Sequence, residues 1–370
     1  MQFRILRTEL FSAINKVSRA VSSKSPLPVL TGIKFNLTDN ALILTGSDSD
    51  ITIETVIEKN EKKLTIFQTG AVVLTGHYIS EIIRKIDSEY IDIEIIDGTL
   101  TRIKGERSEF NLNGIKAIDY PKIDLSCKRE HFTIESLLLK TLITQTVFAT
   151  SDKETRPILT GVNFRAGNGE LSCIATDSYR LAKKVISVDE NLQFNITIPA
   201  KSLNEISKII EKVEDVEVYV SERKILFNMN GSIVQTRLID GAFPDTSRLM
   251  PSNFDYELSV DSRDILSAID RASLFASESS NIVKLTMSEN NVQISSKSQE
   301  IGSVEEDLHS AIFTGRPLNI SFSAKYVTDA IRAISSNKIK IYFVGDMKPF
   351  IIKNDDDESL TQLVLPVRTY

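Results

Sequence analysis

The sequence predicts an α+β fold in which one pattern of helices and antiparallel sheet occurs three times. Residues 28–51 and 157–180 align without a gap at an offset of 129, with 8 identities in 24 positions. Residues 282–301 form a weaker third copy at an offset of 250, with the same apolar rhythm. A period of about 125 residues is too long for a solenoid and long enough for a domain with its own core. We therefore expect three domains, with bounds at 1–125, 126–250 and 251–370.

Each repeat is expected to begin with an amphipathic helix. Apolar residues recur three and four positions apart, which is the spacing of one helix face. In the three repeats these are Leu10, Ala13, Ile14 and Val17, then Leu139, Leu142 and Ile143, then Ile265, Ala268 and Ile269.

A strand hairpin and a second helix follow in each repeat. Ile33, Phe35 and Leu37 alternate with polar residues, a turn at 38–40 follows, and Leu42 and Leu44 alternate again. This pattern is typical of a hairpin with one buried face. Further strands are expected at 91–96, 216–220 and 339–344. The six predicted helical segments are 7–21, 77–86, 135–149, 201–212, 262–275 and 325–336.

Composition is ordinary for a globular protein, with 41% apolar and 25% charged residues. No apolar stretch reaches the 18 or so residues that a membrane span needs, and the N-terminus has no apolar secretory segment. Cys127 and Cys173 cannot form a disulfide framework, so we expect a cytoplasmic protein.

Charge is unevenly distributed between the two kinds of element. The six helical segments carry a net charge of +5, although the whole chain carries −6. The segment 87–97 holds five acids and no base. One interpretation is that helices are simply solvated by Lys and Arg. The other is a polyanion-binding face made of helices, because phosphate contact needs local basic density and not a basic protein overall.

Five segments, taken in their order and spacing, resemble the bacterial β sliding clamp family, the processivity subunit of the replicative DNA polymerase. The C-terminal segment resembles clamps of Gram-positive type. The segments are LPVLTGIKF at 27–35, RPILTGVNF at 156–164, ATDSYRLA at 175–182, DGAFPDTSRL at 240–249 and QLVLPVRTY at 362–370.

The resemblance implies three clamp domains per chain, each with two helices on the inner face and antiparallel sheets outside. Two chains would close head to tail into a ring that encircles duplex DNA. The expected function is to tether the replicative DNA polymerase and other replication and repair proteins for processive synthesis. The expected partners are duplex DNA, the polymerase, the clamp loader, other proteins with a clamp-binding motif and a second copy of the chain, without a membrane.

The resemblance also implies a DNA-binding surface. It places Lys24 on a DNA-facing loop and Lys153 at the equivalent place in the central repeat, although both could be ordinary solvated lysines. His77 stands where the family usually has a basic residue, and a neutral imidazole would make no strong phosphate contact. The helical segments add Arg19, Arg84, Lys208 and Lys212 to this surface.

A pocket for partner peptides is implied between the second and third domains and the C-terminus. Apolar walls there would bind short peptides through one or two apolar anchors, and Arg180 and Arg248 could hold backbone carbonyls or a carboxylate. Lys348 and Phe350 replace smaller family residues, which predicts a narrower and more cationic mouth. The pocket residues are Leu159, Thr176, Ser178, Tyr179, Arg180, Leu181, Pro244, Arg248, Leu249, Lys348, Phe350, Leu363, Val364, Leu365, Pro366, Val367 and Arg368.

Ring closure would need an apolar contact between the first and third domains. Phe110, Leu274 and Phe275 match the family's interface positions. Leu274 and Phe275 stand where the first repeat has Arg19 and Ala20, and this difference suggests a task specific to the third repeat. A local adjustment of the core is the alternative explanation.

An enzyme is the main rival class. His77, His131 and His309 lie far apart without the spacing of metal ligands, and there is no phosphate-binding Gly-rich loop. Asp48 and Asp177 recur in two repeats, but an Asp beside a turn more often makes structural hydrogen bonds. We expect a non-catalytic protein without cofactor or metal. A repeat scaffold that binds peptides without encircling DNA stays open as the alternative.

Overall fold

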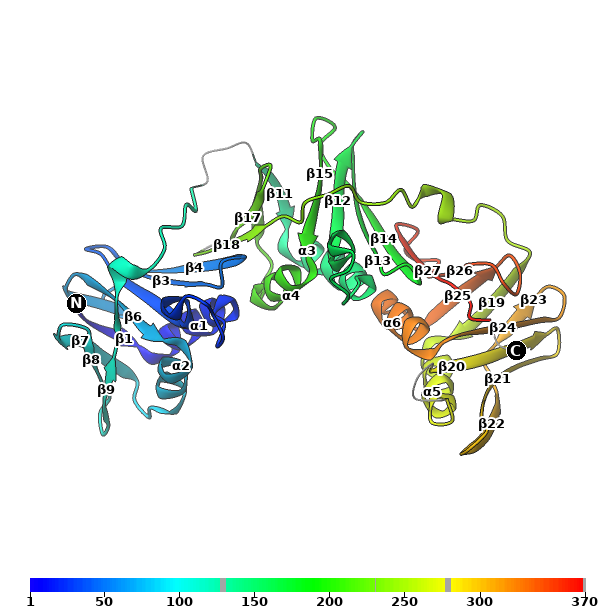
Figure 1. Ribbon diagram of the computed structural model, residues 1–370, viewed down its shortest axis with the longest axis horizontal. Helices are drawn as coiled ribbons and strands as arrows, with labels where there is room; N and C mark the ends of the chain where they lie inside the picture. The colour runs from blue at the N-terminus through cyan, green and yellow to red at the C-terminus, as the bar shows by residue number, and fades with distance from the viewer. Residues whose placement is uncertain (127–130, 230, 277–280, 369–370) are drawn as a thin grey trace. The chain divides into compact units, whose positions relative to one another are not determined.

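The computed structural model describes residues 1–126, 131–229, 231–276 and 281–368 of the chain. The chain folds into two compact units, one of residues 1–139 with 205–238 and one of residues 140–204 with 239–370 (Figure 1). Each unit combines one outer repeat with part of the central repeat. The three domain bounds expected from the sequence stay a prediction. Cys127 lies outside the described residues, and Cys173 is buried.

Two antiparallel sheets make up the first unit. Its strands are β1 (Gln2–Leu6), β2 (Gly32–Leu37), β3 (Ala41–Ser47), β4 (Ile51–Glu58), β5 (Leu64–Gln68), β6 (Gly70–Thr75), β7 (Tyr90–Asp97), β8 (Leu100–Lys104), β9 (Glu109–Asn113), β10 (Ile115–Lys116), β11 (Phe132–Glu135), β16 (Asp215–Val220), β17 (Lys224–Met229) and β18 (Ser232–Arg237). One sheet has the order β5-β1-β7-β8-β9, and the other β10-β6-β2-β3-β4-β18-β17-β16-β11. The nine-stranded sheet therefore runs from the first repeat into the central repeat.

The second unit repeats this plan with a nine-stranded and a four-stranded sheet. Its strands are β12 (Gly161–Gly167), β13 (Glu170–Thr176), β14 (Arg180–Ser187), β15 (Phe194–Pro199), β19 (Tyr256–Asp261), β20 (Ile282–Ser288), β21 (Asn291–Ser298), β22 (Gly302–Asp307), β23 (Ile312–Thr314), β24 (Leu318–Ser323), β25 (Lys338–Phe343), β26 (Phe350–Lys353) and β27 (Leu360–Val364). The orders are β15-β12-β13-β14-β27-β26-β25-β19-β23 and β22-β21-β20-β24.

The predicted hairpin forms in all three repeats with one register. Phe35 lies opposite Leu44, Phe164 opposite Cys173, and Leu285 opposite Ile294, and all six side chains are buried. Because side chains alternate between the faces of a strand, this shared register puts the same positions into each core. The strands expected at 91–96, 216–220 and 339–344 correspond to β7, β16 and β25.

Each repeat contributes two helices, as the apolar spacing predicted. The apolar faces of α1 and α5 are buried at the positions named from the sequence. The first helix of the first and of the central repeat is shorter than expected and continues as a 3₁₀ turn, Ser18–Ala20 and Val147–Ala149. The helices are α1 (Arg7–Val17), α2 (Gly76–Lys85), α3 (Ser136–Thr146), α4 (Ala200–Ile209), α5 (Ser262–Ser273) and α6 (Ala324–Ile334).

Helix α4 ends at Ile209, three residues before the end of the segment 201–212 that the sequence predicts. The Ser136 hydroxyl donates to the Lys212 carbonyl over 2.8 Å and accepts from the Glu214 amide over 3.1 Å. These bonds hold the segment that follows α4 against Ser136, the first residue of α3. Lys212 therefore lies beyond the helix, in the segment that leads to β16.

The repeats are joined by the same strand pairing at two places. At the first junction β4 of the first repeat pairs with β18 of the central repeat, and Ile53 lies opposite Val234. At the second junction β14 of the central repeat pairs with β27 of the third repeat, and Ala182 lies opposite Gln362. By chain order, β22 and β9 hold the equivalent positions in the third and first repeats. In the described part of the chain they pair only with β21 and β8.

Candidate functional site

The turn Thr176–Arg180 between β13 and β14, here called the pocket turn, is held by its own side chains. The Asp177 carboxylate accepts from the amides of Tyr179 and Arg180 over 2.9 and 3.0 Å. The Thr176 hydroxyl donates to the Arg180 carbonyl over 2.6 Å and accepts from the Ser178 amide over 3.2 Å. Ser178 has a φ of 78°, and these bonds hold it in that left-handed conformation. The structural role expected of Asp177 is confirmed.

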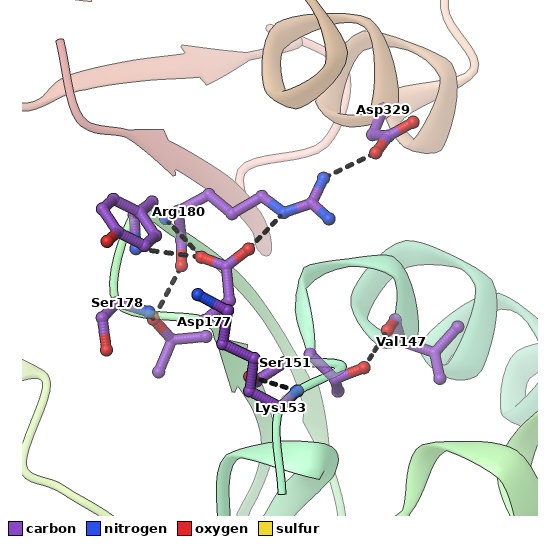
Figure 2. Close-up of polar contacts among 10 residues, drawn as sticks. Val147, Ser151, Lys153, Asp177, Ser178, Arg180 and Asp329 are labelled. Carbon is purple, nitrogen blue, oxygen red and sulfur yellow. Dashed lines mark hydrogen bonds and ion pairs between the residues drawn. The ribbon is translucent and has the colours of Figure 1, made fainter. Parts of the chain in front are cut away.

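Arg180 is nearly buried and is bonded to its own chain. Its Nε donates to Asp177 over 3.0 Å, and its Nη1 donates to Asp329 on α6 over 2.6 Å (Figure 2). The guanidinium carbon lies 4.6 Å from the ring centre of Tyr326 and 5.3 Å from that of Phe148. Arg180 therefore holds two carboxylates of its own chain, between two aromatic rings.

Tyr179 is the exposed aromatic residue of the pocket turn. Its side chain is 56% exposed, and its ring stacks on Tyr326 with a centroid distance of 6.3 Å. Partial burial raises the pKa of Tyr326, and the negative charge of Asp177 raises this pKa further. The two rings form an apolar surface with a polar edge, which suits contact with a peptide side chain.

The expected wall residues divide into a buried and an accessible group. Leu159, Thr176, Leu181, Leu363 and Val364 are buried. Phe350 is 1% exposed and packs between Phe322 and Phe343, so it belongs to the core of the third repeat and does not narrow the mouth. The accessible residues are Ser178, Tyr179, Pro244, Arg248, Leu249, Lys348 and Arg368, with Leu365, Pro366 and Val367 half-buried.

The C-terminal segment 365–368 crosses between two sheets of the second unit. The Leu365 amide donates to the Tyr179 carbonyl over 2.9 Å, and the Val367 amide donates to the Ser321 carbonyl on β24 over 2.7 Å. These bonds fix the segment beside the pocket turn. The structure thus brings together the pocket turn, Arg180 and the C-terminal segment that the sequence assigned to one site.

Four residues at the pocket turn were not identified from the sequence. They are Phe148, Arg156, Tyr326 and Asp329. Arg156 donates to the Ser178 hydroxyl over 3.4 Å. Tyr326 and Asp329 lie three residues apart, so they share one face of α6. The sequence shows this spacing, but the pattern of the helix is dominated by its apolar face, Val327, Ala330 and Ile331.

The two loops that carry Lys24 and Lys153 have the same local structure. The Lys24 amide donates to the Ser22 hydroxyl over 3.3 Å, and the Lys153 amide donates to the Ser151 hydroxyl over 3.1 Å (Figure 2). Both lysines are exposed, and within the described residues neither amino group has a carboxylate within ion-pair distance. Both amino groups are therefore available to phosphate.

Three of the other residues expected at the DNA surface, Arg19, Arg84 and Lys208, form ion pairs. Arg19 lies 3.3 Å from Glu205, and Lys208 lies 2.8 Å from the same carboxylate. Arg84 pairs with Glu81 over 2.6 Å, and hydrogen bonds from Arg84 and Lys85 lower the pKa of Glu81 to about 2. Lys212 and His77 are exposed, and the His77 ring meets Tyr78 edge-on with centroids 5.5 Å apart. Surface ion pairs contribute little to stability, so these pairs do not prevent the basic residues from contacting phosphate.

The residues expected at a subunit interface lie at free edges of the two units. Phe110 is half-buried on β9, the edge strand of the five-stranded sheet. Leu274 is 72% exposed directly after α5, and Phe275 follows it half-buried. A large exposed leucine beside a free sheet edge is typical of a surface that meets another chain.

The described residues contain no group of three or more His, Cys, Asp or Glu side chains that could hold a metal ion. The His131 ring instead lies 3.9 Å from Glu217 and beside Tyr219. No helix in the described chain has both the length and the apolar character needed to cross a membrane.

Comparison with known proteins identifies one family across the whole chain. Models of the N-terminal, central and C-terminal domains of the DNA polymerase III beta subunit match residues 1–124, 133–245 and 247–368. The beta sliding clamps of Bacillus subtilis and Staphylococcus aureus are 43% and 40% identical to the chain, with full coverage of both proteins. These relatives confirm the expected resemblance to clamps of Gram-positive type.

Solved structures agree with the sequence comparison. The DNA polymerase sliding clamp of Bacillus subtilis matches with a TM-score of 0.95 at 42% identity, and covers 100% of both chains. The beta subunit of Streptococcus pyogenes DNA polymerase matches with a TM-score of 0.94 at 34% identity, again over 100% of both chains. The chain therefore belongs to the family of DNA polymerase III beta subunits, the bacterial beta sliding clamps.

Proposed function

We propose that two copies of this chain close head to tail into a ring that encircles duplex DNA. In this ring the chain acts as the processivity subunit that tethers the replicative DNA polymerase and other replication and repair proteins. It has no catalytic role of its own, and it works in the cytoplasm, where replicating DNA is found. The observation that carries this proposal is the pair of free strand edges, β9 and β22.

The internal junctions indicate how the ring would close. At both junctions, the fourth strand of one repeat pairs with the third strand after the second helix of the next repeat, as β4 with β18 and β14 with β27. The third repeat ends this series with β22, and the first repeat begins it with β9. Pairing β22 of one chain with β9 of another extends the same rule around a closed ring of two chains.

The register of the internal junctions predicts which residues of β22 and β9 lie opposite each other. Ile53 lies opposite Val234 at the first junction. By strand register, Val304 on β22 is equivalent to Ile53, since they lie opposite the equivalent residues Ser296 and Gly46. By the same reasoning Phe110 on β9 is equivalent to Val234, since they lie opposite Ile103 and Phe227. We therefore place Phe110 of one chain opposite Val304 of the other, beside Leu274 and Phe275. Burial of such a cluster of apolar side chains stabilises association by roughly 1.5–3 kcal/mol for each large residue.

The helices would line the hole of the ring and contact phosphates without reading bases. The free amino groups of Lys24 and Lys153 suit this task, and Arg19, Arg84, Lys208 and Lys212 add positive charge. Contacts with phosphate alone carry no sequence information, so such a lining allows the ring to slide.

The pocket turn would bind short peptides of the polymerase, the clamp loader and other partners. Tyr179 and Leu249 present exposed apolar surface, and the half-buried C-terminal segment borders the turn. Arg248 and Lys348 are exposed, and their positive charges suit an acidic group on the peptide. Removal of residues 367–370 is expected to abolish peptide binding and to leave the dimer intact.

Loss from linear DNA tests encirclement directly. The protein is loaded on a nicked circular plasmid with a bacterial clamp loader and ATP, and the plasmid is then cut. A ring slides off the free ends, so gel filtration should show release from linear DNA and retention on the circle. Retention on both forms would mean ordinary affinity, as a peptide-binding scaffold with a basic surface would show.

Mass and cross-linking test ring closure separately. Light scattering should give a dimer near twice 41.4 kDa at micromolar concentration, and a monomer would contradict the proposal. The double variant F110C/V304C should form a disulfide-linked dimer on oxidation. The matched control F110C/I312C carries its second cysteine on β23, away from the proposed edge, and should stay unlinked.

A further inference from the structure

Both junctions contain an arginine that pairs with the same helical position. At the first junction, Arg19 lies 3.3 Å from Glu205 on α4. At the second junction, Arg180 lies 2.6 Å from Asp329 on α6. The segments 196–209 and 320–333 align as the second half of their repeats, and this alignment makes Glu205 and Asp329 equivalent.

The two arginines come from different positions of the repeat. Arg19 belongs to the 3₁₀ turn that follows α1, and the equivalent residue of the central repeat is Phe148. Arg180 belongs to the pocket turn, and the equivalent residue of the first repeat is Ile51, which is 1% exposed. Each 3₁₀ turn packs against the strands on both sides of its β-turn, so either position reaches the helical carboxylate.

We propose that Arg180 is a positioning residue for the peptide site, and that it acts as a latch between the pocket turn and α6. This inference rests on the peptide-binding function proposed above. The latch consists of Asp177, Arg180 and Asp329. At the first junction the arginine lies on the 3₁₀ turn, whereas at the second junction it lies on the pocket turn. The contact between two repeats at the second junction therefore also determines the shape of the peptide site.

The contacts of Arg180 explain how it shapes the site. Asp177 binds the arginine with one carboxylate oxygen, and with the other it accepts from the amides that form the pocket turn. The carbonyl of Tyr179 in turn receives the Leu365 amide. The guanidinium also lies over Tyr326, on which Tyr179 stacks. The latch therefore fixes the turn, the stacked rings and the C-terminal segment together.

A direct contact with the peptide is the competing role for Arg180. The arginine is 7% exposed, and its Nε and Nη1 donate hydrogen bonds to carboxylates of its own chain. A positioning role predicts that removal of Asp329 weakens peptide binding, although Asp329 would touch no peptide. A direct role predicts that only removal of Arg180 does so.

The test compares two equivalent carboxylates in the full-length protein. D329N breaks the latch at the second junction, and E205Q breaks the equivalent pair at the first junction and serves as the matched control. The probe is a fluorescein-labelled peptide that carries one aspartate and ends in a leucine–phenylalanine pair. We expect D329N to bind the probe about tenfold more weakly, because the variant loses roughly one charge-assisted hydrogen bond. We expect E205Q to change the affinity for the probe less than twofold.

A double-mutant cycle separates the two roles. If Arg180 acts through Asp329, R180A and R180A/D329N should bind the probe equally weakly, because the second change removes nothing further. Unchanged binding by D329N together with a large loss in R180A would overturn the inference and make Arg180 a direct ligand. Light scattering of each variant checks that the protein stays dimeric.

Hydrogen exchange tests the latch without any peptide. The amides of Tyr179 and Arg180 should exchange at least tenfold faster in D329N than in the wild type, and at an unchanged rate in E205Q. Unchanged exchange in D329N would overturn the inference on its own. Failure of the wild-type protein to bind the probe would instead refute the proposed peptide site, and the exchange rates would still decide whether the latch exists.

Discussion

The turn at 47–51 in the first repeat and the pocket turn at 176–180 share a backbone and differ in their side chains. The Asp48 carboxylate accepts from the amides of Asp50 and Ile51 over 3.1 and 2.9 Å, as Asp177 does from the equivalent amides. Ser49 has a φ of 83°, close to the 78° of Ser178. The Ser47 hydroxyl donates to the Ile51 carbonyl over 3.1 Å, as Thr176 does in the pocket turn.

The comparison separates what builds the repeat from what is added to it. The Asp and the hydroxyl residue before it are kept because the left-handed residue between the strands needs their bonds. Asp50 and Ile51 give way to Tyr179 and Arg180, which present an aromatic ring and bind α6. The same turn therefore closes a hairpin in both repeats, and in the central repeat it also binds α6 and carries the exposed Tyr179 of the proposed peptide site.

Placing the arginine of the pocket turn into the first repeat should give the largest effect. I51R buries a guanidinium where Arg19 already occupies Glu205, so the new charge lacks a free carboxylate. We expect the free energy of unfolding to fall by about 3–5 kcal/mol, measured by urea denaturation.

The double variant R19F/I51R sharpens this result. It reproduces the arrangement of the second junction, in which Phe148 stands at the position of Arg19 and Arg180 stands at the position of Ile51. It should recover about half of the stability lost in I51R, because Glu205 then keeps Lys208 as a partner and can accept the new arginine in place of Arg19. A double variant as unstable as I51R would show that the two positions are not interchangeable.

Removal of the shared aspartate should have a smaller and unequal effect in the two turns. D48A loses hydrogen bonds to two backbone amides and should destabilise the protein by about 1 kcal/mol. D177A loses the equivalent hydrogen bonds and also one of the two carboxylate partners of the buried Arg180. We therefore expect the free energy of unfolding to fall by about 2–3 kcal/mol. If urea denaturation shows the same loss of unfolding free energy for D48A and D177A, the contact between Asp177 and Arg180 does not stabilise the protein.

The repeated fold could be predicted from the sequence because its cores use the same apolar positions. Offsets of 129 and 250 placed Phe35, Phe164 and Leu285 at one position of a hairpin, and each is buried there. The helix faces followed from spacing for the same reason. Helix ends were less predictable, since the end of α4 depends on the hydroxyl of Ser136, which is distant in sequence.

The candidate site could be predicted only in part. The family resemblance indicated Tyr179 and Arg180, but nothing local shows that Arg180 binds Asp329, which is 149 residues away. Phe350 was expected at the mouth because its position matched the family. Its burial between Phe322 and Phe343 depends on packing that only the structure shows. The DNA-contacting role of the basic residues stays a prediction.

A further difference between the junctions predicts unequal sensitivity to acid. At the second junction Lys184 on β14 lies 2.5 Å from Asp357, whereas the equivalent residue of the first junction, Thr55, shares a neutral hydrogen bond of 3.1 Å with Ser232. Burial acts to raise the pKa of Asp357, but bonds from Lys184 and Ser359 outweigh it and leave this pKa below its usual value. The stabilisation is therefore present above the pKa that Asp357 has in the unfolded chain, and it is lost as the pH falls through the lower pKa of the folded state.

Between pH 5 and pH 3, amides of β27 should lose protection from hydrogen exchange, after correction for intrinsic rates, before those of β18. D357N should remove this difference at every pH, and equal loss of protection in the two strands of the wild type would contradict it.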